Sequence, residues 1–430
     1  MSRILIGNRG ASDAIGEWGK PVEGWWSQRI IWSVKDGDVV ILPHAPDPDF
    51  LAYALNVLNV DRKQVRIITP DTPTVADGWL CEPALVRKVA TELETVSCDL
   101  IRALNPNKEV AAFASAIGLS SAFPGARFFA QEGARFAESK SFFRAICAGV
   151  GAPIPEGAVA TTPGATVTIV EDLLATTRAV ILKKDFWAGG SGNLLLRTDK
   201  DIAPLGVREA IDLDEVEGAV RSTVHERWDW LTEGGRHAFV VESYLPDSAA
   251  VFAEFWIDEA VTLRATGELV AIPLADHSQL PLPPSHSRSE AQLVETGLRL
   301  ATAYQRLGYR GTLSVDAIIH GSDLFLTEVN ALDTGSTHVY TLAERLAGAS
   351  FADDRIVLEY VGWAPGVDFE EARRRLDAAQ LHYNSETRTG VSILNSQRAP
   401  DATVPYLLIA RDLEEAAGIQ EQLGMATQLH

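Results

Sequence analysis

Cysteines and long apolar runs are scarce in this sequence of 430 residues. Its three cysteines are an odd number without paired metal-ligand spacing, so neither a disulfide framework nor a zinc site is predicted. No apolar run approaches the roughly twenty residues needed to span a bilayer. The first residues read as a strand and not as a signal peptide, so we expect a cytoplasmic protein without a membrane partner.

Positive charge is also in short supply. The chain has 38 lysine and arginine residues against 58 acidic residues, a formal net charge of -20. Nucleic acids are bound by basic surfaces, so this balance argues against a nucleic-acid partner. No lysine follows Lys200, which makes the positions of Lys140, Lys183 and Lys184 more informative than they would be in a lysine-rich chain.

The first third of the chain predicts a parallel α/β domain. Apolar runs at 39–43 and 65–70 flank a stretch with helical spacing at 49–60, and this alternation is typical of βαβ units. A chain of 430 residues is too long to fold around one compact core, so two to three domains are expected. The sequence contains no recognisable internal repeat. A homo-oligomer remains an open alternative to a monomer.

The pattern of the sequence changes at Glu138. An amphipathic helix at 139–146 is followed by a run of strands and a long helix at 290–307. The last seventy residues combine apolar strands with two charged helices, which indicates a small α+β cap. We therefore expect α/β and α+β architecture in three domains: 1–130, 131–355 and 356–430.

Two apolar runs at 314–319 and 324–330 are joined by a polar, glycine-containing turn, which predicts an antiparallel hairpin. Asp316, Glu328 and Asn330 would then project from neighbouring strands. Their side chains offer the hard oxygen ligands that suit Mg²⁺ bridging nucleotide phosphates. The alternative is an ordinary hairpin with a polar outer face.

A glycine-rich loop follows the strand that ends in Lys183. Glycines allow backbone N–H groups to approach phosphate oxygens, and a lysine adds a point charge against the same anion. The loop lacks the G-x-x-x-x-G-K-[ST] pattern of a Walker motif. Taken alone, such a loop is more often a surface hairpin.

The order of these motifs along residues of about 130 to 350 resembles the ATP-grasp superfamily. The resemblance implies that Lys140 and Lys183 bind phosphates and that ATP and Mg²⁺ are the cofactors. The positions matched to the family are the phosphate lid Gly189, Gly190, Ser191 and Gly192, the adenine hinge Glu242, Ser243, Tyr244 and Leu245, and the Mg²⁺ ligands Asp316, Glu328 and Asn330.

The segment after Asn330 sits where such ligases position a carboxylate or acyl phosphate, with Gly335 and Ser336 as the matched residues. Many family members carry an arginine two residues before the first metal-ligand acid, where this chain has Ser314. The candidates to supply that charge are Arg264, Arg288 and Arg310. The ribose-binding acid has two weak candidates, Asp247 and Glu254.

The flanking segments resemble the pre-ATP-grasp peptide ligases of the pheganomycin type. That resemblance implies an ATP-dependent, ADP-forming ligase of antibiotic or other natural-product biosynthesis. It would activate a small amino-acid-like carboxylate as an acyl phosphate and couple it to the amine of an amino acid or peptide. The alternatives are an ATP-grasp kinase that phosphorylates a small molecule and a non-catalytic nucleotide-binding scaffold.

Two histidines, His286 and His338, could assist amine deprotonation, although hydrogen bonding or packing is the commoner role. An acceptor groove could be lined by the tryptophans near the N-terminus, for which core packing or a subunit contact is the commoner fate. These residues are Trp18, Trp25, Trp26 and Trp32.

Overall fold

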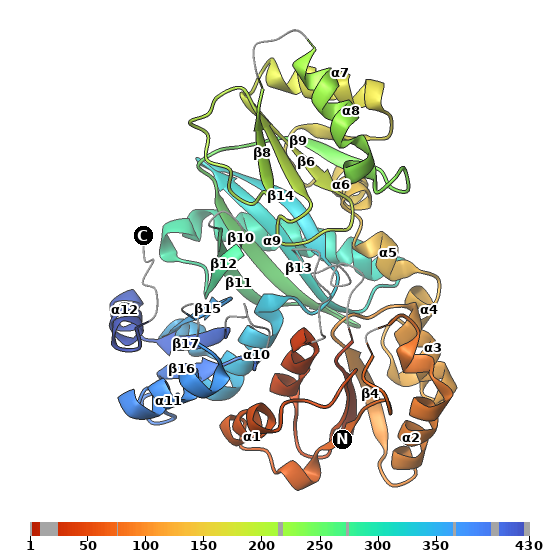
Figure 1. Ribbon diagram of the computed structural model, residues 1–430, viewed down its shortest axis with the longest axis vertical. Coiled ribbons are helices and arrows are strands. Elements are labelled where there is room, and N and C mark those ends of the chain that lie inside the picture. The colour runs from red at the N-terminus through yellow and green to blue at the C-terminus, as the bar shows by residue number, and fades with distance from the viewer. Residues whose placement is uncertain are drawn as a thin grey trace.

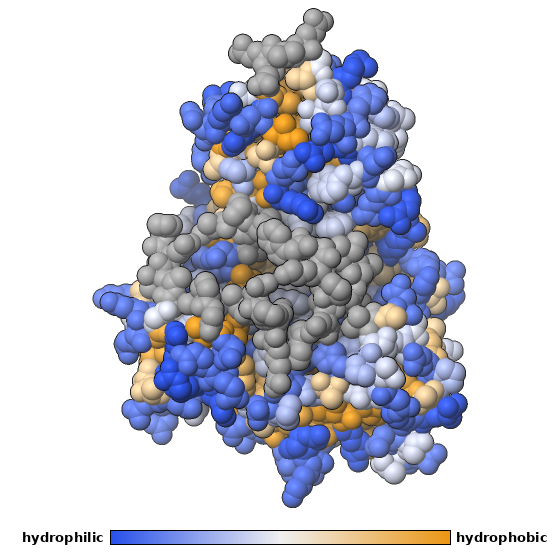
Figure 2. Space-filling view, in the orientation of Figure 1, coloured by the Kyte–Doolittle hydropathy of each residue, from blue (hydrophilic) through white to orange (hydrophobic). Residues whose placement is uncertain are grey.

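The computed structural model describes residues 2–8, 25–74, 76–213, 218–271, 275–363, 367–396 and 404–424. Its strands form three sheets (Figure 1). A parallel sheet lies at the N-terminal end of the molecule, a five-stranded sheet at the opposite end, and an eight-stranded sheet between them. Hydrophilic side chains cover most of the coloured surface in Figure 2, as the net charge of -20 leads one to expect.

The N-terminal sheet has the order β3-β2-β1-β4, and all of its pairings are parallel. This confirms the parallel α/β prediction. Alternate residues of β1 enter separate cores, with Leu5 on one face and Ile4 and Ile6 on the other, because helices and neighbouring sheets cover both faces. The strands are β1 (Ser2–Ile6), β2 (Val39–Ile41), β3 (Arg66–Ile68) and β4 (Cys98–Ala103).

The five-stranded sheet has the order β5-β9-β6-β7-β8. Helices α7 (Pro163–Leu174) and α8 (Ala219–Thr232) pack against one face of this sheet, where Val180, Leu182 and Val241 are buried. The strands are β5 (Gly157–Ala160), β6 (Ala179–Lys184), β7 (Asn193–Arg197), β8 (Glu209–Asp212) and β9 (Phe239–Ser243).

The eight-stranded sheet has the order β14-β13-β10-β11-β12-β15-β17-β16. Helix α9 (Ser287–Leu307) covers one face, where Phe255, Val315 and Val329 are buried. The strands are β10 (Ala249–Ile257), β11 (Val261–Ala271), β12 (Ala275–Leu280), β13 (Gly311–His320), β14 (Asp323–Asn330), β15 (Ile356–Tyr360), β16 (Gly390–Ile393) and β17 (Tyr406–Ala410).

The C-terminal segment continues the central sheet. Strand β15 pairs antiparallel with β12, and β17 pairs with β15, so the α+β cap expected from residue 356 extends the sheet that carries the predicted metal hairpin. Helices α11 (Phe369–Ala379) and α12 (Leu413–Gln422) pack on these added strands. The expected boundary between residues 355 and 356 thus falls within one sheet.

The remaining helices connect these sheets. Two of them bear on the site, namely α6 (Lys140–Val150) and α10 (Gly335–Ala347). The other α-helices are α1 (Pro48–Val57), α2 (Pro83–Leu93), α3 (Lys108–Ala116), α4 (Ala126–Phe129) and α5 (Gly133–Ala137). The 3-10 helices are η2 (Trp25–Ser33), η3 (Arg62–Gln64), η4 (Trp79–Cys81), η5 (Ser120–Ala122), η6 (Pro284–His286) and η7 (Phe351–Asp353). None of the helices in the described ranges is long and apolar enough to cross a bilayer.

Candidate active site between the five-stranded and eight-stranded sheets

The predicted hairpin is formed by β13 and β14, and Asp316 lies directly opposite Glu328 in its ladder. Both residues alternate along their strands with Val315 and Val329, which are buried beneath α9, so the acids lie on the opposite face. Asn330 belongs to the same row and donates from Nδ2 to Asp316 Oδ2 at 2.9 Å. The structure thus brings the three predicted metal ligands together.

The two acids share an unusual electrostatic environment. Burial, and then the adjacent negative charge of Glu328, raise the pKa of Asp316 to about 8. Burial opposes ionisation of Glu328 as well, but the ammonium groups of Lys140 and Lys183 hold the pKa of this carboxyl below its ordinary value. The pair therefore carries less negative charge at neutral pH than two free carboxylates would.

The residues of this pair fit a magnesium ion by their chemistry. Two carboxyl groups and an amide oxygen are typical hard ligands, and a divalent cation would relieve the repulsion that raises the pKa of Asp316. Within the described ranges, three or more His, Cys, Asp or Glu side chains do not gather at any potential metal site. The proposed ligand set is therefore limited to two acids and Asn330.

Lys140 and Lys183 both reach this site from the five-stranded sheet and its neighbouring helix. Lys140 is the first residue of α6, and its Nζ lies 2.9 Å from Glu328 Oε2. Lys183 lies in β6, and its Nζ lies 2.6 Å from Glu242 Oε2. Both lysines are more than nine-tenths buried. Two buried ammonium groups beside a pair of acids form a cradle suited to a polyphosphate with its metal ion.

Glu242 was expected in the adenine hinge. Its side chain is 1% exposed and lies between two cations, since Arg144 NH1 binds Oε1 at 2.5 Å while Lys183 approaches Oε2. Arg144 also donates to the carbonyl of Gly157 at 2.8 Å. The Glu242 side chain thus neutralises and orients Lys183, while its backbone belongs to β9.

The end of the predicted hinge has an unpaired donor. Ser243 N–H and Tyr244 N–H donate to the carbonyls of Glu156 and Ala179. In contrast, the N–H of Leu245 donates to no other residue of the described chain. The Tyr244 hydroxyl is occupied, since it donates to the Ala203 carbonyl at 2.8 Å. A free backbone donor at the end of this hinge is what an adenine ring would require there.

The glycine loop connects β6 to β7. Gly189 and Gly190 have φ values of 62° and 78°, which favour glycine. A Cβ on Gly192 would lie 2.4 Å from Cβ of Trp187, so no other residue fits there without movement of the loop. Ser191 is buried, and its hydroxyl donates to the carbonyl of Ala188 at 2.6 Å. The loop therefore has a defined shape close to the two lysines.

A third group of polar residues surrounds the N-terminus of α10. Ser336 and Thr337 lie in its first turn, and their hydroxyls point at Glu254 Oε2 at 3.5 Å and 2.5 Å. Glu254 is fully buried, which raises its pKa. Gly335 starts the helix, where unpaired N–H groups favour a bound anion. Asp247, the other ribose candidate, is exposed and has a φ of 55°.

The three candidate arginines occupy different places. Arg264 lies near Glu254, with its guanidinium 5.1 Å from the ring centre of Tyr340 and 6.0 Å from that of Trp256. Arg310 donates to the carbonyls of Gln305 and Tyr309 at the end of α9. Arg288 is exposed in the first turn of α9, on the far side of the sheet. Only Arg264 of the three lies beside the polar groups at α10.

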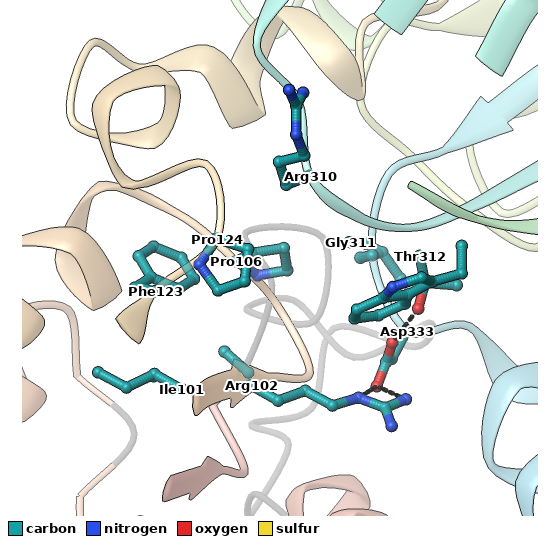
Figure 3. Close-up of a pocket in the computed structure, with 12 residues that line it drawn as sticks. Ile101, Arg102, Pro106, Phe123, Pro124, Arg310, Gly311, Thr312 and Asp333 are labelled. Carbon is teal, nitrogen blue, oxygen red and sulfur yellow. Dashed lines mark hydrogen bonds and ion pairs between the residues drawn. The ribbon is translucent and has the colours of Figure 1, made fainter. Parts of the chain in front are cut away.

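A cavity of about 30 Å³ lies where the N-terminal sheet meets the central sheet (Figure 3). Arg102 points toward Asp333, and their closest N–O distance is 2.7 Å. Thr312 donates to the other carboxylate oxygen at 2.6 Å. Arg310 also lines this cavity, but its side chain points away from Asp333. Asp333 lies just before α10, so its ion pair with Arg102 joins the start of this helix to the N-terminal sheet.

The histidines and tryptophans are largely structural. His338 is 4% exposed, and burial lowers its pKa to about 3, so its ring is neutral. His286 pairs with Glu268 at 3.4 Å, away from the predicted metal ligands.

The tryptophan Trp32 is fully buried and donates to the Leu394 carbonyl, which excludes it from an acceptor groove. Trp26 is half-buried beside Arg29. The prediction for Trp18 and for the Trp25 side chain lies outside the described residues.

Several residues that build the site were missed in the sequence. Arg144 lies beside Phe143 and Cys147 on the buried face of α6, a mismatch that could have marked it as the partner of a buried acid. Asp185 directly follows the two lysines of β6 and binds the N-terminus of α6. Arg102 and Asp333 pair across 231 positions, a contact for which the sequence gives no signal.

Comparisons with known proteins agree with this architecture. A family model described as the pre ATP-grasp domain matches residues 27–119, and one described as the PGM1 C-terminal domain matches residues 371–423. Among solved structures, an ADP complex of N5-carboxyaminoimidazole ribonucleotide synthetase has a TM-score of 0.59 at 11% identity, covering 98% of this chain and 96% of that one. The chain has the ATP-grasp fold and carries a pre-ATP-grasp domain.

Two further structures extend this ATP-grasp likeness. The N5-carboxyaminoimidazole ribonucleotide synthetase of Thermus thermophilus has a TM-score of 0.57 at 14% identity and covers 100% of this chain and 99% of its own. A biotin carboxylase from Campylobacter jejuni in a β-γ-ATP complex has a TM-score of 0.57 at 14% identity, covering 98% and 91%. No curated protein matches the chain in sequence. The sequence-based prediction of an ATP-grasp fold is therefore confirmed.

Proposed function

We propose that this protein is an ATP-dependent carboxylate–amine ligase that forms ADP and phosphate. The observation that carries the proposal is the convergence of Lys140, Lys183, Asp316, Glu328 and Asn330 between the five-stranded and the eight-stranded sheet. Structures of similar fold were solved with ADP or with MgADP and bicarbonate, which supports ATP and Mg²⁺ as the groups used here. All five residues belong to the described chain.

The proposed roles follow from position. Asp316, Glu328 and Asn330 would hold Mg²⁺, which neutralises phosphate charge during transfer. Lys140 and Lys183 would bind the phosphates, and the N–H of Leu245 would donate a hydrogen bond to the adenine edge. The loop from Gly189 to Gly192 would exclude water from the site.

We infer that the substrate carboxylate binds at the N-terminus of α10. Backbone donors at Gly335 and Ser336 and the cation of Arg264 would stabilise its negative charge. A carboxylate oxygen would attack the γ-phosphorus of ATP and ADP would leave, which gives an acyl phosphate. The amine of an amino acid or peptide would then attack the acyl carbon, lose one proton and displace phosphate, which leaves an amide.

The finer assignment is a peptide ligase of the pheganomycin type, acting in natural-product biosynthesis. The sequence resemblance of both flanks supports it, and the match to the PGM1 C-terminal domain falls within one of these flanks. An ATP-grasp kinase would use the same lysines and acids without an amine. The acceptor requirement therefore separates these two functions.

The test is product analysis with ATP, Mg²⁺ and a panel of amino-acid-like carboxylates, with and without a short peptide. Mass spectrometry should detect ADP, phosphate and a new amide only when both partners are present. Asp316→Asn and Glu328→Gln should abolish product, whereas Glu386→Gln in an exposed turn should not. A phosphorylated small molecule formed without an amine would establish a kinase instead.

A further inference from the structure

Asp185 lies between the two lysines and the glycine loop. It directly follows β6, which carries Lys183, and it is 7% exposed. Its carboxylate accepts from Ser139 Oγ at 2.8 Å and from the N–H of Ser141 at 2.7 Å. Its carbonyl accepts from the N–H of Lys140 at 3.2 Å. Asp185 therefore binds the start of α6 through both its side chain and its backbone.

These contacts satisfy donors that a helix leaves unpaired. The first N–H groups of a helix have no partner within the helix, and a carboxylate there also opposes the positive end of the helix dipole. Ser139 accepts from the N–H of Phe142, so the serine and Asp185 together cap the first turn. Asp185 thus fixes a helix that begins with Lys140 to the strand that holds Lys183.

The loop after Asp185 is held by the same helix. Lys140 Nζ donates to the carbonyl of Trp187 at 2.5 Å while it pairs with Glu328. Trp187 in turn packs against Gly192 and lies over Lys184, with 4.3 Å between the ammonium and the ring centre. A displacement at Asp185 would therefore reach Lys140 directly, and it would reach the glycine loop through the contact between Lys140 and Trp187.

We propose that Asp185 is a positioning residue that sets the nucleotide affinity of the site by holding Lys140 at a fixed place relative to Lys183. The inference rests on the proposed use of ATP by these two lysines. Asp185 touches neither the phosphates nor the metal in this assignment. It acts through the start of α6, whose lysine would otherwise lose its alignment with Glu328.

The experiment is isothermal titration of MgADP into the full-length protein and its variants, which needs no turnover. Asp185→Ala should weaken MgADP affinity by about tenfold, because a lost cap of this kind displaces the first turn. Asp185→Asn keeps an oxygen for the Ser141 N–H and should restore most of the affinity. In turnover assays, Asp185→Ala should raise KM for ATP with little change in KM for the carboxylate.

A matched control is Asp412→Ala. Asp412 caps α12 by accepting from the N–H of Glu415 at 2.8 Å, far from the lysines in the C-terminal segment. It should lower the melting temperature without changing MgADP affinity. If Asp185→Ala does not fold, Ser139→Ala removes one of the two donors to Asp185 and should weaken MgADP in the same direction.

The outcomes separate the two hypotheses. MgADP affinity unchanged in Asp185→Ala, or in Ser139→Ala where that variant is used, would overturn the positioning role, as would an equal loss in Asp412→Ala. Lys140→Met and Lys183→Met should weaken MgADP in either case. If the unsubstituted protein binds no MgADP, or if neither lysine variant changes the affinity, the proposed function itself fails.

Discussion

The ammonium of Lys183 lies 2.6 Å from a carboxylate oxygen of Glu242, whose other oxygen is bound by Arg144. Glu242 is thus the acid with which both buried cations form an ion pair. Truncating it would leave both cations unpaired, whereas removing Lys183 would leave a complete Arg144–Glu242 pair. The stability and the function of this triad should therefore respond to different substitutions.

We expect Glu242→Ala to lower the free energy of unfolding by ~3–5 kcal/mol, the usual cost of an uncompensated buried charge. Lys183→Met should cost only ~1–2 kcal/mol, because one ion pair is lost while Glu242 keeps Arg144 as its partner. Lys183→Met should nevertheless abolish nucleotide binding. Urea unfolding followed by titration with MgADP tests both statements, and a larger stability loss in Lys183→Met than in Glu242→Ala would contradict them.

Three arginine variants should identify the residue that stabilises the transferred phosphoryl group. Arg264→Met should reduce turnover by at least about a hundredfold, because this guanidinium faces the polar groups at α10. Arg310→Met should instead lower stability by ~1 kcal/mol, because it loses the carbonyls at the end of α9. Exposed Arg288→Met serves as the control and should change neither quantity. Full activity in Arg264→Met would remove it from the mechanism.

Substitution of Gly192 should separate loop shape from folding. Gly192→Ala forces a Cβ against Trp187, so we expect KM for ATP to rise several-fold while the protein stays folded. Gly164→Ala is the control, since a Cβ there meets nothing within 4 Å and α7 should gain about 0.5–1 kcal/mol. Equal KM values for the two variants would show that the loop tolerates a side chain.

The acid Glu359 gives a pH-dependent prediction. It lies beside Ser278, His338 and Arg29, and burial raises its pKa to about 7 from 4.5. The folded protein therefore holds this proton where the unfolded chain has lost it, so Glu359 removes stability as pH rises from 4.5 to about 7. Relative to the unsubstituted protein, Glu359→Gln should become progressively more stable across that range.

Chemical denaturation at several pH values measures this difference. Above pH 7 the difference should level off, since Glu359 is then ionised in both states. His338, with its lowered pKa, contributes with the opposite sign, because its neutral folded form loses stability as pH falls below 6.5. A difference that does not change with pH would contradict the assignment.

Local patterns were enough to predict the elements that carry the site. Alternation and a glycine turn predicted the hairpin that places Asp316 opposite Glu328, and strand–helix alternation predicted the parallel N-terminal sheet. The long helix was predicted from residue 290 and begins at Ser287. These features depend on residues close together in the chain.

Contacts between distant segments could not be predicted in the same way. The role of Glu242 depends on the pairing of β9 with β6 and on the approach of Arg144 from α6. The Arg102–Asp333 pair depends on how two domains pack. Neither the hydrophobic period nor the order of motifs contains this information, so charge partners were the least predictable part of the site.

The continuation of the central sheet into its C-terminal strands has a consequence for how the chain can be divided. A protein cut after residue 355 would leave β12 without its neighbour β15, and a row of backbone donors and acceptors would become a free edge. Such an edge invites aggregation, so an excised fragment of residues 1–355 should be insoluble. The C-terminal strands and the rest of the central sheet are in this sense a single cooperative folding unit.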